Sequence, residues 1–459
     1  MFAKDSKHLV VGFGITGLSI VKTLARLGVD SGVDSIFAID SRVDPPNCDE
    51  IQPLCKKIET GTLDSALLDE CDYLWVSPGV AIATPALAKT IARLPKENVG
   101  GDIELFARLV KENIIAITGT NGKSTVTTLV ASIFAETGYD LYVGGNLGFP
   151  ALDLWLQYRD RDLDDVREPL FVLELSSFQL ETTDSLQADV GVVLNLSPDH
   201  MDRYRDYQHY VESKFKLFAQ SETMIIPTNE PLVDKALQDR RFQGFSEVKR
   251  FSLEKLSESD YYSDLQEQSV IAKSGEVVSY EGTMLGGTHN ILNIVAGVAI
   301  AETFGASLAA IKAGILSYQP LAHRSVFVRE IDGVAYYNDS KATNISSTEA
   351  AILGFPQRKW LILGGVTKDQ DFSVLKTLLL NNVAGVALIG ADYYTILPHI
   401  PESIPVFESK TLDVALLDLK RIAVSGDIVL FSPACASFDQ FKGFEHRGDV
   451  FEEYVSKLV

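Results

Sequence analysis

Short apolar runs alternate along the chain with stretches whose apolar residues recur at helical spacing. The first run, residues 8–11, precedes a glycine loop at 12–17 and helical spacing over 18–27. A second run at 35–39 completes a predicted βαβ unit. Further strands are predicted at 73–76, 114–117, 170–175, 190–194, 224–226, 360–363, 386–389 and 428–431. This alternation predicts an α/β fold in which helices cover parallel sheets.

Two breaks in the helical periodicity divide the chain. One lies at 93–101 and the other at 317–321, and a proline interrupts the pattern in each. The length of 459 residues is also two to three times that of a typical domain. We therefore predict three domains, at 1–99, 100–321 and 322–459.

Two segments of the middle domain differ from their surroundings. Residues 157–168 are dense in charge, and residues 230–281 are polar with weak periodicity. We interpret both as surface elaborations without a catalytic role.

The composition is that of an ordinary globular protein, with 46% hydrophobic and 22% charged residues. It excludes the disordered, collagenous and disulfide-scaffold classes. The chain carries 62 acidic and 41 basic residues, and its net charge of −21 disfavours binding to nucleic acid or to an anionic membrane. No apolar stretch approaches the ~18 residues that span a bilayer. Four cysteines without a CxxC pair favour a reducing cytoplasm, and we expect a soluble protein.

The first glycine loop matches a dinucleotide-binding pattern. Gly12, Gly14 and Gly17 form a GxGxxG motif between a strand and a helix, and Asp40 ends the next strand. An NAD site is one interpretation of this pattern. Backbone N–H groups at a helix N-terminus bind any pyrophosphate, including that of a UDP-sugar, and a tight turn that only packs the helix is a third interpretation.

A second loop, Thr-Gly-Thr-Asn-Gly-Lys-Ser-Thr at 118–125, lies between a predicted strand and a predicted helix. Its glycines let backbone amides approach phosphates, Lys123 can neutralise β- and γ-phosphate oxygens, and the Ser124 or Thr125 hydroxyl can reach Mg²⁺. The loop departs from strict GxxxxGK[ST] because Ile117 occupies the position of the first glycine. We predict a nucleotide-phosphate site here.

Charged side chains follow the next two predicted strands. Glu174 lies at the end of one strand, where the carboxylate is a natural Mg²⁺ ligand. His200 follows the other strand beside carboxylates, so it is a candidate metal ligand as neutral imidazole, with a purely structural role as the alternative.

Two further pairs have weaker signals. Periodicity alone predicts that Lys214 and Lys216 are solvated lysines on an amphipathic helix. Asn290 and Asn293, at i and i+3, place two amides on one helix face, where they can contact an adenine edge; N-capping by Asn290 is the alternative.

Polar loops also follow the strands of the third domain. His323 and Arg324 come directly after the predicted boundary, where a cation can reach a phosphate. Three loops after strands, at 338–344, 364–372 and 432–444, converge on one sheet edge in the predicted fold. Their polar residues together predict a ligand site.

Six motifs, in this order and over nearly the whole chain, resemble those of the Mur ligase family. They are Gly-Thr-Asn-Gly-Lys-Ser-Thr at 119–125, Glu-Leu-Ser-Ser-Phe-Gln at 174–179, Asp-His-Met-Asp-Arg-Tyr at 199–204, His289-Asn290 with Asn293, His323-Arg324, and Asn-Asp-Ser-Lys-Ala-Thr-Asn at 338–344. Within the family, the first and last of these motifs and Ser-Pro-Ala-Cys-Ala-Ser at 432–437 are similar to the branch that adds D-glutamate.

The resemblance implies three α/β domains: an N-terminal Rossmann-like domain for a UDP-linked substrate, a central P-loop ATPase-like domain, and a C-terminal Rossmann-like domain that closes over the cleft. It implies an ATP-dependent ligase that adds D-glutamate to UDP-N-acetylmuramoyl-L-alanine through an acyl-phosphate, in cytoplasmic peptidoglycan precursor synthesis. A sister or folylpolyglutamate-type ligase that adds a different amino acid is the alternative. We expect no nicotinamide, nucleic acid or membrane partner, and a monomer.

The resemblance also implies roles for individual residues. ATP contacts would come from Gly119, Thr120, Asn121, Gly122, Lys123, Ser124, Thr125, Asn290, Asn293, Arg324 and Asp339. UDP-substrate contacts would come from Ile15, Thr16, Asp40, Ser41, Arg42, Ser77, Asn146 and His200. D-Glutamate contacts would come from Lys341, Thr343, Lys368, Ser437 and Phe444. Two Mg²⁺ ions would be served by Ser124, Glu174, His200 and Lys214, the last as a carbamate four residues after Tyr210. Catalytic roles would fall to Lys123, Glu174, His200, Lys214 and Lys341. The chain departs from the family at Asp369-Gln370, where a glycine usually follows the lysine.

Overall fold

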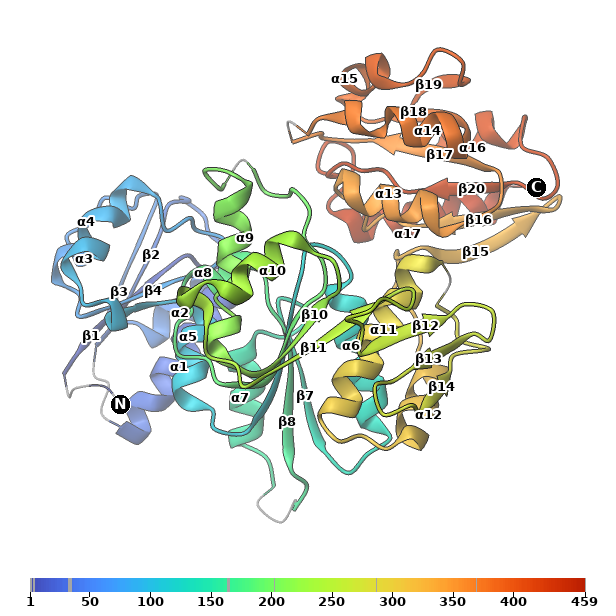
Figure 1. The fold of residues 1–459 in the computed structure, drawn as a ribbon. Coiled ribbons are helices and arrows are strands. Elements are labelled where there is room, and N and C mark those ends of the chain that lie inside the picture. Colours follow the sequence, from blue (N-terminus) through green and yellow to red (C-terminus); the bar gives the residue numbers. More distant parts are fainter. Residues whose placement is uncertain are drawn as a thin grey trace. The chain divides into compact units, whose positions relative to one another are not determined.

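The computed structural model describes residues 2, 5–31, 35–162, 166–201, 203–285, 287–368 and 370–458 (Figure 1). Internal contacts group the chain into two compact units. The first unit comprises Met1–Leu196, Arg203–Ser279 and Ala296–Ile315. The second unit comprises Ser197–Asp202, Tyr280–Val295 and Leu316–Val459. The domain limits predicted at 99/100 and 321/322 stay predictions.

The first unit begins with a five-stranded parallel sheet of order β3-β2-β1-β4-β5. Its elements are β1 (Lys7–Val11), α1 (Ile15–Ser31), β2 (Ser35–Asp40), α2 (Cys48–Ile51), β3 (Lys57–Thr60), α3 (Leu67–Glu70), β4 (Tyr73–Val76), α4 (Pro85–Arg93) and β5 (Val99–Gly100). The strand order reverses between β1 and β4, so the loops after these strands flank the switch point where Rossmann-like sheets bind ligands.

Both faces of this first sheet are covered, which explains its continuous apolar runs. In β1, Val10 packs on the face that α1 covers, whereas Leu9 and Val11 pack on the other face with Leu67 of α3 and Leu87 of α4. The α1 core continues into α5 and α7 and onto the strands of the next sheet, so the first two sheets share one hydrophobic core.

The second sheet has nine strands in the order β14-β13-β12-β11-β10-β9-β6-β8-β7. Its elements are α5 (Asp102–Leu109), β6 (Asn113–Thr118), α6 (Lys123–Ala135), β7 (Asp140–Gly145), α7 (Ala151–Arg159), β8 (Pro169–Glu174), α8 (Ser177–Glu181), β9 (Ala188–Val193), α9 (Tyr207–Phe215), β10 (Ser221–Pro227), α10 (Pro231–Gln238), β11 (Glu247–Ser252), β12 (Tyr261–Asp264), β13 (Ser269–Ile271), β14 (Val277–Ser279), α11 (Thr288–Thr303) and α12 (Leu308–Ser317). Strands from β7 to β12 pair in parallel, and β12 to β14 pair antiparallel.

The prediction that residues 230–281 form a surface elaboration is wrong. Strands β11 to β14 lie in this segment and extend the second sheet. Phe251, Tyr261 and Val270 are buried there, each with at least one polar neighbour. Because β12, β13 and β14 have only four, three and three residues, no clear period-2 pattern is established. In the other charge-dense segment, α7 extends to Arg159, and residues 163–165 lie outside the described residues.

The second unit contains the third sheet, of order β15-β16-β20-β17-β18-β19, in which β15 alone pairs antiparallel. Its elements are β15 (Val326–Ile331), β16 (Val334–Asn338), α13 (Ile345–Gly354), β17 (Lys359–Gly364), α14 (Lys376–Asn382), β18 (Val383–Ile389), α15 (Tyr393–Ile396), β19 (Val406–Lys410), α16 (Leu412–Lys420), β20 (Ile428–Phe431) and α17 (Phe444–Lys457). Short 3-10 helices lie at Gln52–Leu54, Lys96–Asn98, Phe218–Gln220, Arg240–Phe242, Phe372–Leu375 and Leu397–His399. Separate cores cover the two faces of the sheet, with α13 and α14 on one and α16 and α17 on the other. The three sheets confirm the predicted α/β fold class.

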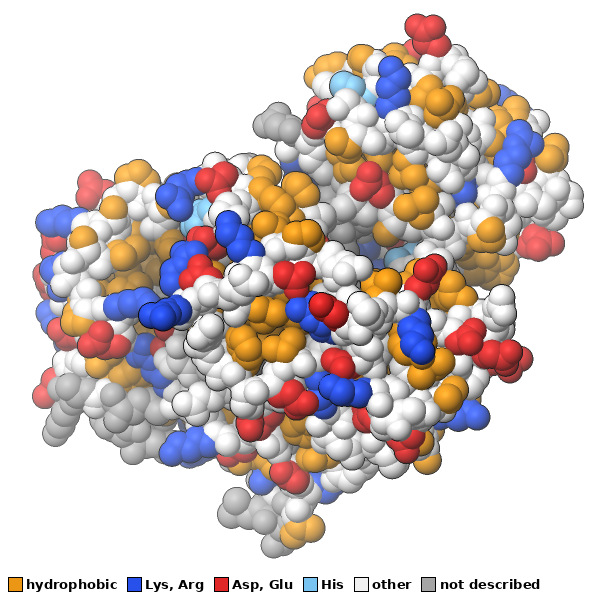
Figure 2. Space-filling view, in the orientation of Figure 1, with side chains coloured by type: hydrophobic (Ala, Val, Ile, Leu, Met, Phe, Trp, Pro, Cys, Tyr) orange, Lys and Arg blue, Asp and Glu red, His pale blue; other side chains and the backbone are white. Residues whose placement is uncertain are grey.

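Over the described residues on the face in view, Lys and Arg are interspersed with Asp and Glu (Figure 2). None of the described helices combines the length and the hydropathy that crossing a bilayer requires. All four cysteines are free thiols.

His8 is buried in the first sheet as a neutral imidazole that is hydrogen-bonded on both ring nitrogens. His8 is 0% exposed, stacks on Tyr73 with 4.7 Å between ring centroids, and accepts a hydrogen bond at Nδ1 from Trp75 Nε1 at 3.0 Å. Because Nδ1 accepts, Nε2 carries the proton and donates to Ser6 Oγ at 2.8 Å. Burial lowers the pKa of His8 to about 4, although the charge of Asp72 opposes this.

We expect the free energy of unfolding to fall as the pH falls from about 6.5 towards 4, because only unfolded His8 then gains a proton. The loss attributable to His8 is at most about 3 kcal/mol. Urea unfolding at pH 7 and at pH 5, monitored by tryptophan fluorescence, measures this change in the free energy of unfolding. His8→Gln should show the shallower pH dependence, and equal slopes for the two proteins would contradict this assignment.

Candidate active site

The phosphate loop joins β6 to α6 at the carboxyl edge of the second sheet. Gly122 precedes α6 with a φ of 81°, which favours glycine and turns the chain into the helix N-terminus. The Lys123 ammonium donates to the carbonyl oxygens of Gly119 at 3.0 Å and Thr120 at 2.8 Å. The loop thus presents a helix N-terminus and a lysine side by side, as the sequence predicts.

Asn195 fixes the shape of this loop, and our sequence analysis gave it no role. Its carbonyl oxygen accepts from Thr120 N at 3.0 Å, and its side chain both accepts from Asn121 N at 2.8 Å and donates to Asn121 O at 2.9 Å. The position of Asn195 in the sequence could have indicated this role, because it follows β9, the strand that pairs with β6.

Glu174 ends β8, the other neighbour of β6, and is 2% exposed. Its Oε1 accepts from Asn146 Nδ2 at 2.7 Å, whereas Oε2 is buried and has no hydrogen-bond partner among the described residues. A buried carboxylate oxygen without a partner is costly unless a cation satisfies it. Ser124, at the start of α6, adds a hydroxyl from the same sheet edge, so the residues present fit an oxygen-liganded Mg²⁺.

Lys214 corrects the expectation from periodicity, because it is 1% exposed rather than solvated. Its ammonium donates to Gly119 O at 2.9 Å and lies 4.8 Å from the centroid of the Tyr210 ring. Tyr210 itself is hydrogen-bonded to Thr120 Oγ1 at 3.0 Å. The α9 face therefore packs on the phosphate loop, and Lys214 belongs to the site. Lys216 is half-buried, and its Nζ lies 3.0 Å from Asp184 Oδ1.

His200 lies in a different compact unit from Glu174 and Lys214. It has a φ of 57°, and its Nε2 lies 3.7 Å from Asp199 Oδ2. Asp199 also accepts from Asn344 Nδ2 at 2.9 Å. Across the residues that the structure describes, no three His, Cys, Asp or Glu side chains form a metal-binding group. The joint ligation of magnesium by His200 and Lys214 therefore stays a prediction.

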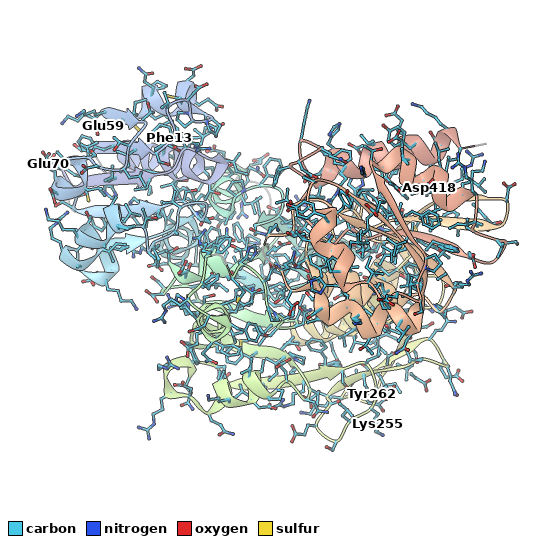
Figure 3. The ribbon with its side chains drawn as sticks, turned by 90° about the horizontal axis from the view of Figure 1, so that it is seen from above. Phe13, Glu59, Glu70, Lys255, Tyr262 and Asp418 are labelled. Atoms are coloured by element: carbon cyan, nitrogen blue, oxygen red, sulfur yellow. The ribbon has the colours of Figure 1, made fainter. Side chains whose placement is uncertain are left out.

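The glycine loop of the first sheet is shaped by a close backbone approach. A Cβ on Gly17 would lie 1.8 Å from Gly12 O, so only glycine fits there. Phe13, labelled in Figure 3, lies in this loop, and its backbone N–H donates to Asp40 Oδ2 at 2.7 Å. Ile15, at the start of α1, is 64% exposed and available to a ligand.

Asp40 supports this loop from β2. The carboxylate is 2% exposed and accepts further hydrogen bonds from the Arg42 backbone N–H and guanidinium. Burial raises the pKa of Asp40, but the hydrogen bonds and charge of Arg42 and the Phe13 N–H outweigh burial and lower it overall. Because these groups occupy the carboxylate, it is poorly placed to bind the ribose of a dinucleotide. Ser41 and Arg42 are exposed beside it.

Arg203, to which sequence analysis also gave no role, holds the loop that follows β4. Its guanidinium donates to Pro78 O at 2.5 Å and to Val80 O at 3.3 Å, and lies 3.8 Å from the centroid of the Phe178 ring. Ser77 begins this loop and packs against Gly12. Arg203 therefore ties the ligand edge of the first sheet to α8 of the second.

In the second unit, Asp339 is buried after β16 and accepts from Ser325 N at 3.0 Å and Ser432 Oγ at 2.7 Å. Burial raises the pKa of Asp339 to about 7, while those hydrogen bonds and the charge of Arg324 oppose the rise. Arg324 is thus close enough to Asp339 for its charge to act on the carboxylate, and the ATP contacts expected of both residues stay a prediction.

A cavity of about 390 Å³ adjoins this pair. Asn290 and Arg324 line it together with the aromatic rings of Phe327, Tyr337 and Phe355. The helix α11 begins at Thr288, so Asn290 does not cap it. Asn293 Nδ2 donates to Asn290 Oδ1 at 3.2 Å, which confirms that the two amides share a face. An apolar cavity with amide and guanidinium groups suits a flat heteroaromatic base.

The loops expected to bind D-glutamate also meet in the second unit. Lys341 Nζ lies 3.6 Å from the centroid of the Phe444 ring, and Ser437 is 2% exposed. Thr343 is half-buried just before the N-cap of α13. Lys368 is exposed and, with His200, lines a cavity of about 460 Å³. Asp369 lies outside the described residues.

Arg447 supports these loops from α17 and was missing from our sequence analysis. It is 1% exposed and donates to Ser340 Oγ at 3.0 Å, Ser340 O at 2.7 Å and Cys435 O at 2.9 Å. Burial lowers the pKa of Arg447 to about 10. In the sequence Arg447 resembles an ordinary helix arginine, because its acceptors are backbone and hydroxyl groups 12 and 107 residues away.

Comparison with known proteins identifies the family. The Mur ligase middle domain matches residues 117–301, and the Mur ligase MurD-like N-terminal domain matches residues 6–96. The UDP-N-acetylmuramoylalanine–D-glutamate ligase of Nitrosococcus oceani is 39% identical over 98% of this chain and 96% of its own length. The protein of that name from Pseudomonas fluorescens is 40% identical over 100% of both chains.

Solved structures show the same fold. The MurF ligase from Thermotoga maritima in complex with ADP has a TM-score of 0.61 at 17% identity, over 99% of this chain and 96% of that one. A pseudomurein peptide ligase type C from Methanothermus fervidus has a TM-score of 0.59 at 15% identity, over 98% of this chain and 100% of that one. With its phosphate loop, its glycine loop and full-length relatives at this identity, the chain belongs to the Mur ligase family.

Proposed function

We propose that this chain is the ATP-dependent ligase that joins D-glutamate to UDP-N-acetylmuramoyl-L-alanine in peptidoglycan precursor synthesis. One observation carries the chemistry: a lysine-bearing phosphate loop lies beside the buried, partly unsatisfied carboxylate of Glu174. The relatives named for this reaction, which match the chain over its full length, support the choice of substrates.

The reaction needs ATP because a carboxylate does not form a peptide bond directly. Its negative charge repels the amine, and its oxygen is a poor leaving group. In the proposed reaction the alanyl carboxylate attacks the γ-phosphorus of ATP, ADP leaves, and an acyl-phosphate forms. The D-glutamate nitrogen then attacks the acyl carbon and loses a proton as phosphate leaves. Lys123 offsets the charge that builds on the phosphate oxygens in the first step.

Magnesium fits the phosphate-loop edge of this chain. Ser124 and Glu174 would hold one ion, and His200 with Lys214 as a carbamate would hold a second. When bound, magnesium offsets phosphate charge as a Lewis acid. Asn146 orients the Glu174 carboxylate through Oε1, which leaves Oε2 available for the ion.

For ATP, we assign the triphosphate to the loop amides of Gly119, Thr120, Asn121, Gly122, Lys123, Ser124 and Thr125. The aromatic cavity of the second unit supports an adenine site in which Asn290 and Asn293 read the base edge. Arg324 and Asp339 would contact the remainder of the nucleotide.

For the UDP-linked substrate, we assign the diphosphate to the loop amides and the start of α1, at Ile15 and Thr16. The exposed Ser41 and Arg42 would meet the uracil, and Asp40 would act by holding Arg42 and the loop in place. Ser77, Asn146 and His200 would line the path of the muramoyl-alanine arm.

For D-glutamate, we assign the two carboxylates to Lys341, Thr343, Lys368, Ser437 and Phe444. The charge of Lys341 and Lys368 and the hydroxyls of Thr343 and Ser437 match two carboxylates. Lys341 is held against the Phe444 ring, which limits its rotamers. The amine is thereby oriented towards the acyl-phosphate, and its proximity accelerates the second step.

The carbamate on Lys214 forms when the uncharged amine attacks CO₂ and releases one proton, which leaves an anionic ligand for the second magnesium ion. Lys214→Ala should lower activity by about 10- to 100-fold. Activity of the unmodified enzyme should also fall in bicarbonate-depleted buffer and return when bicarbonate is added. Lys216→Ala, two residues further on, is the control and should keep both activity and the bicarbonate response. A Lys214→Ala enzyme of full activity would contradict the carbamate.

We propose cytoplasmic localisation, because the proposed reaction consumes ATP and belongs to peptidoglycan precursor synthesis. We also propose that the chain acts as a monomer, which light scattering at working concentration tests.

The decisive experiment measures phosphate release from ATP with UDP-N-acetylmuramoyl-L-alanine present. D-Glutamate is compared with L-glutamate, meso-diaminopimelate, L-lysine and L-alanine. We expect phosphate release only when D-glutamate is the amino acid supplied. If a different amino acid stimulated phosphate release, the proposed mechanism would stand but the substrate assignment would be wrong. If no amino acid stimulated release, both the mechanism and the substrate assignment would be overturned.

A further inference from the structure

The side chain of Gln370 connects three loops of the second unit. Its Nε2 donates to Thr367 O at 2.9 Å and to Ala434 O at 3.0 Å, and its Oε1 accepts from Ile345 N at 3.0 Å. The partners fix the orientation of the amide, because two are carbonyl oxygens and one is an N–H.

Each of these loops carries a residue that we assign to D-glutamate. Thr343 lies two residues before Ile345, Lys368 directly follows Thr367, and Ser437 lies three residues after Ala434. Gln370 and Lys368 also line the same cavity of about 460 Å³. One amide therefore bridges the three segments from which the acceptor site is built.

Two of these segments have backbone conformations that side-chain-bearing residues rarely adopt. Lys368 has a φ of 53° and Ala434 a φ of 59°. Such conformations persist when the surroundings determine them. The Gln370 side chain donates to the carbonyl oxygen of Thr367, which precedes Lys368, and to that of Ala434 itself. The backbone N–H of Gln370 also donates to Thr367 O at 3.2 Å, which closes the turn that contains Lys368. From the other side, Asp392 Oδ2 accepts from Thr367 N at 3.0 Å.

We infer that Gln370 is a positioning residue for the amino-acid acceptor. Its carboxamide holds the three loops at the spacing that D-glutamate requires, without contacting the reacting atoms. The inference rests on the proposed function. It predicts that Gln370 governs the KM for D-glutamate and leaves the KM for ATP unchanged, since the hydrogen-bond partners of its side chain, Ile345, Thr367 and Ala434, are not among the residues that we assign to ATP.

The test is Gln370→Glu, which keeps the shape of the side chain but replaces both N–H donors with an acceptor facing two carbonyl oxygens. We expect the KM for D-glutamate to rise by about tenfold or more, with the KM for ATP within about twofold of the unmodified value. Gln357→Glu is the control, because Gln357 is exposed in the same unit and undergoes the same charge change. It should leave all three substrate KM values unchanged.

Two further variants separate positioning from folding. Gln370→Met removes the polar atoms without adding charge, and Asp392→Asn weakens the same turn from its other side. Thermal unfolding is measured for each. A folded Gln370 variant with an unchanged KM for D-glutamate, or with equal rises in every KM, would overturn the inference, as would failure of all three variants to fold.

The proposed function fails in a different way. If the unmodified enzyme releases no phosphate with D-glutamate, the substrate assignment and the inference fall together. If it turns over D-glutamate normally and Gln370→Glu does so with the same KM, only the inference falls.

Discussion

Replacing Lys123 by alanine should lower kcat/KM for ATP by about 10³-fold. Lys123 is the cation at the N-terminus of α6, and its ammonium lies on the carbonyl oxygens of Gly119 and Thr120. Without it, the charge that develops on the phosphate oxygens during transfer loses one compensating cation. Phosphate release with all three substrates present measures the loss.

Lys111→Ala is the matched control for this variant. Lys111 is an exposed lysine that precedes β6, whereas Lys123 follows the same strand at its other end. The control should retain full activity, and both variants should unfold near the temperature of the unmodified protein. A loss below about tenfold in Lys123→Ala would show that the loop does not hold the transferred phosphate.

The second large effect is expected for Glu174→Gln, which keeps the side-chain shape and removes its charge. We expect activity to fall by about 10²-fold or more, with the magnesium requirement shifted to higher concentration. The reason is that the anionic carboxylate, whose Oε2 is buried and has no partner among the described residues, is replaced by a neutral carboxamide, which is a weaker ligand for a cation. Phosphate release across a magnesium titration measures both changes.

Glu136→Gln, at the exposed C-terminal end of α6, is the control for the loss of one negative charge. It should leave the magnesium titration unchanged. If Glu174→Gln kept the unmodified activity and the same magnesium midpoint, Glu174 would have a structural role only.

Central strands of the parallel sheets were predictable where they are buried on both faces, whereas the edge strands β3, β5, β7 and β19 were not predicted. Tyr73–Val76 and Ile428–Phe431 agree with their predicted limits, since every position between turn residues is apolar or aromatic. The strands β12 to β14 were not predictable in this way. Their sheet edge is partly solvated, and three to four residues per strand are too few to establish a period of two.

Several candidate site residues were predictable for a topological reason. Glu174 ends a strand, Lys123 and Asp339 follow strands, and the carboxyl ends of parallel strands share one edge. Lys214 was not predictable from periodicity, because its burial depends on how α9 packs against the phosphate loop. Only the family resemblance gave it a role.

Residues that act on backbone groups were hardest to predict. Arg203, Arg447 and Gln370 form hydrogen bonds with carbonyl oxygens and N–H groups that carry no side-chain identity. Their partners are up to about 125 residues away in the sequence, so neither composition nor spacing indicates the contact. The residues of the GxGxxG motif left three interpretations open, and only the family resemblance favoured a UDP-linked substrate.

Because Asn195 holds the backbone of Thr120 and Asn121 from a neighbouring strand, the curvature of the phosphate loop is a property of the folded chain. The conformational entropy of these residues is lost during folding, and little remains to be lost when a nucleotide arrives. Association should then be set by diffusion and charge rather than by loop rearrangement. The loop is ordered once, when the chain folds, and every catalytic cycle uses it again.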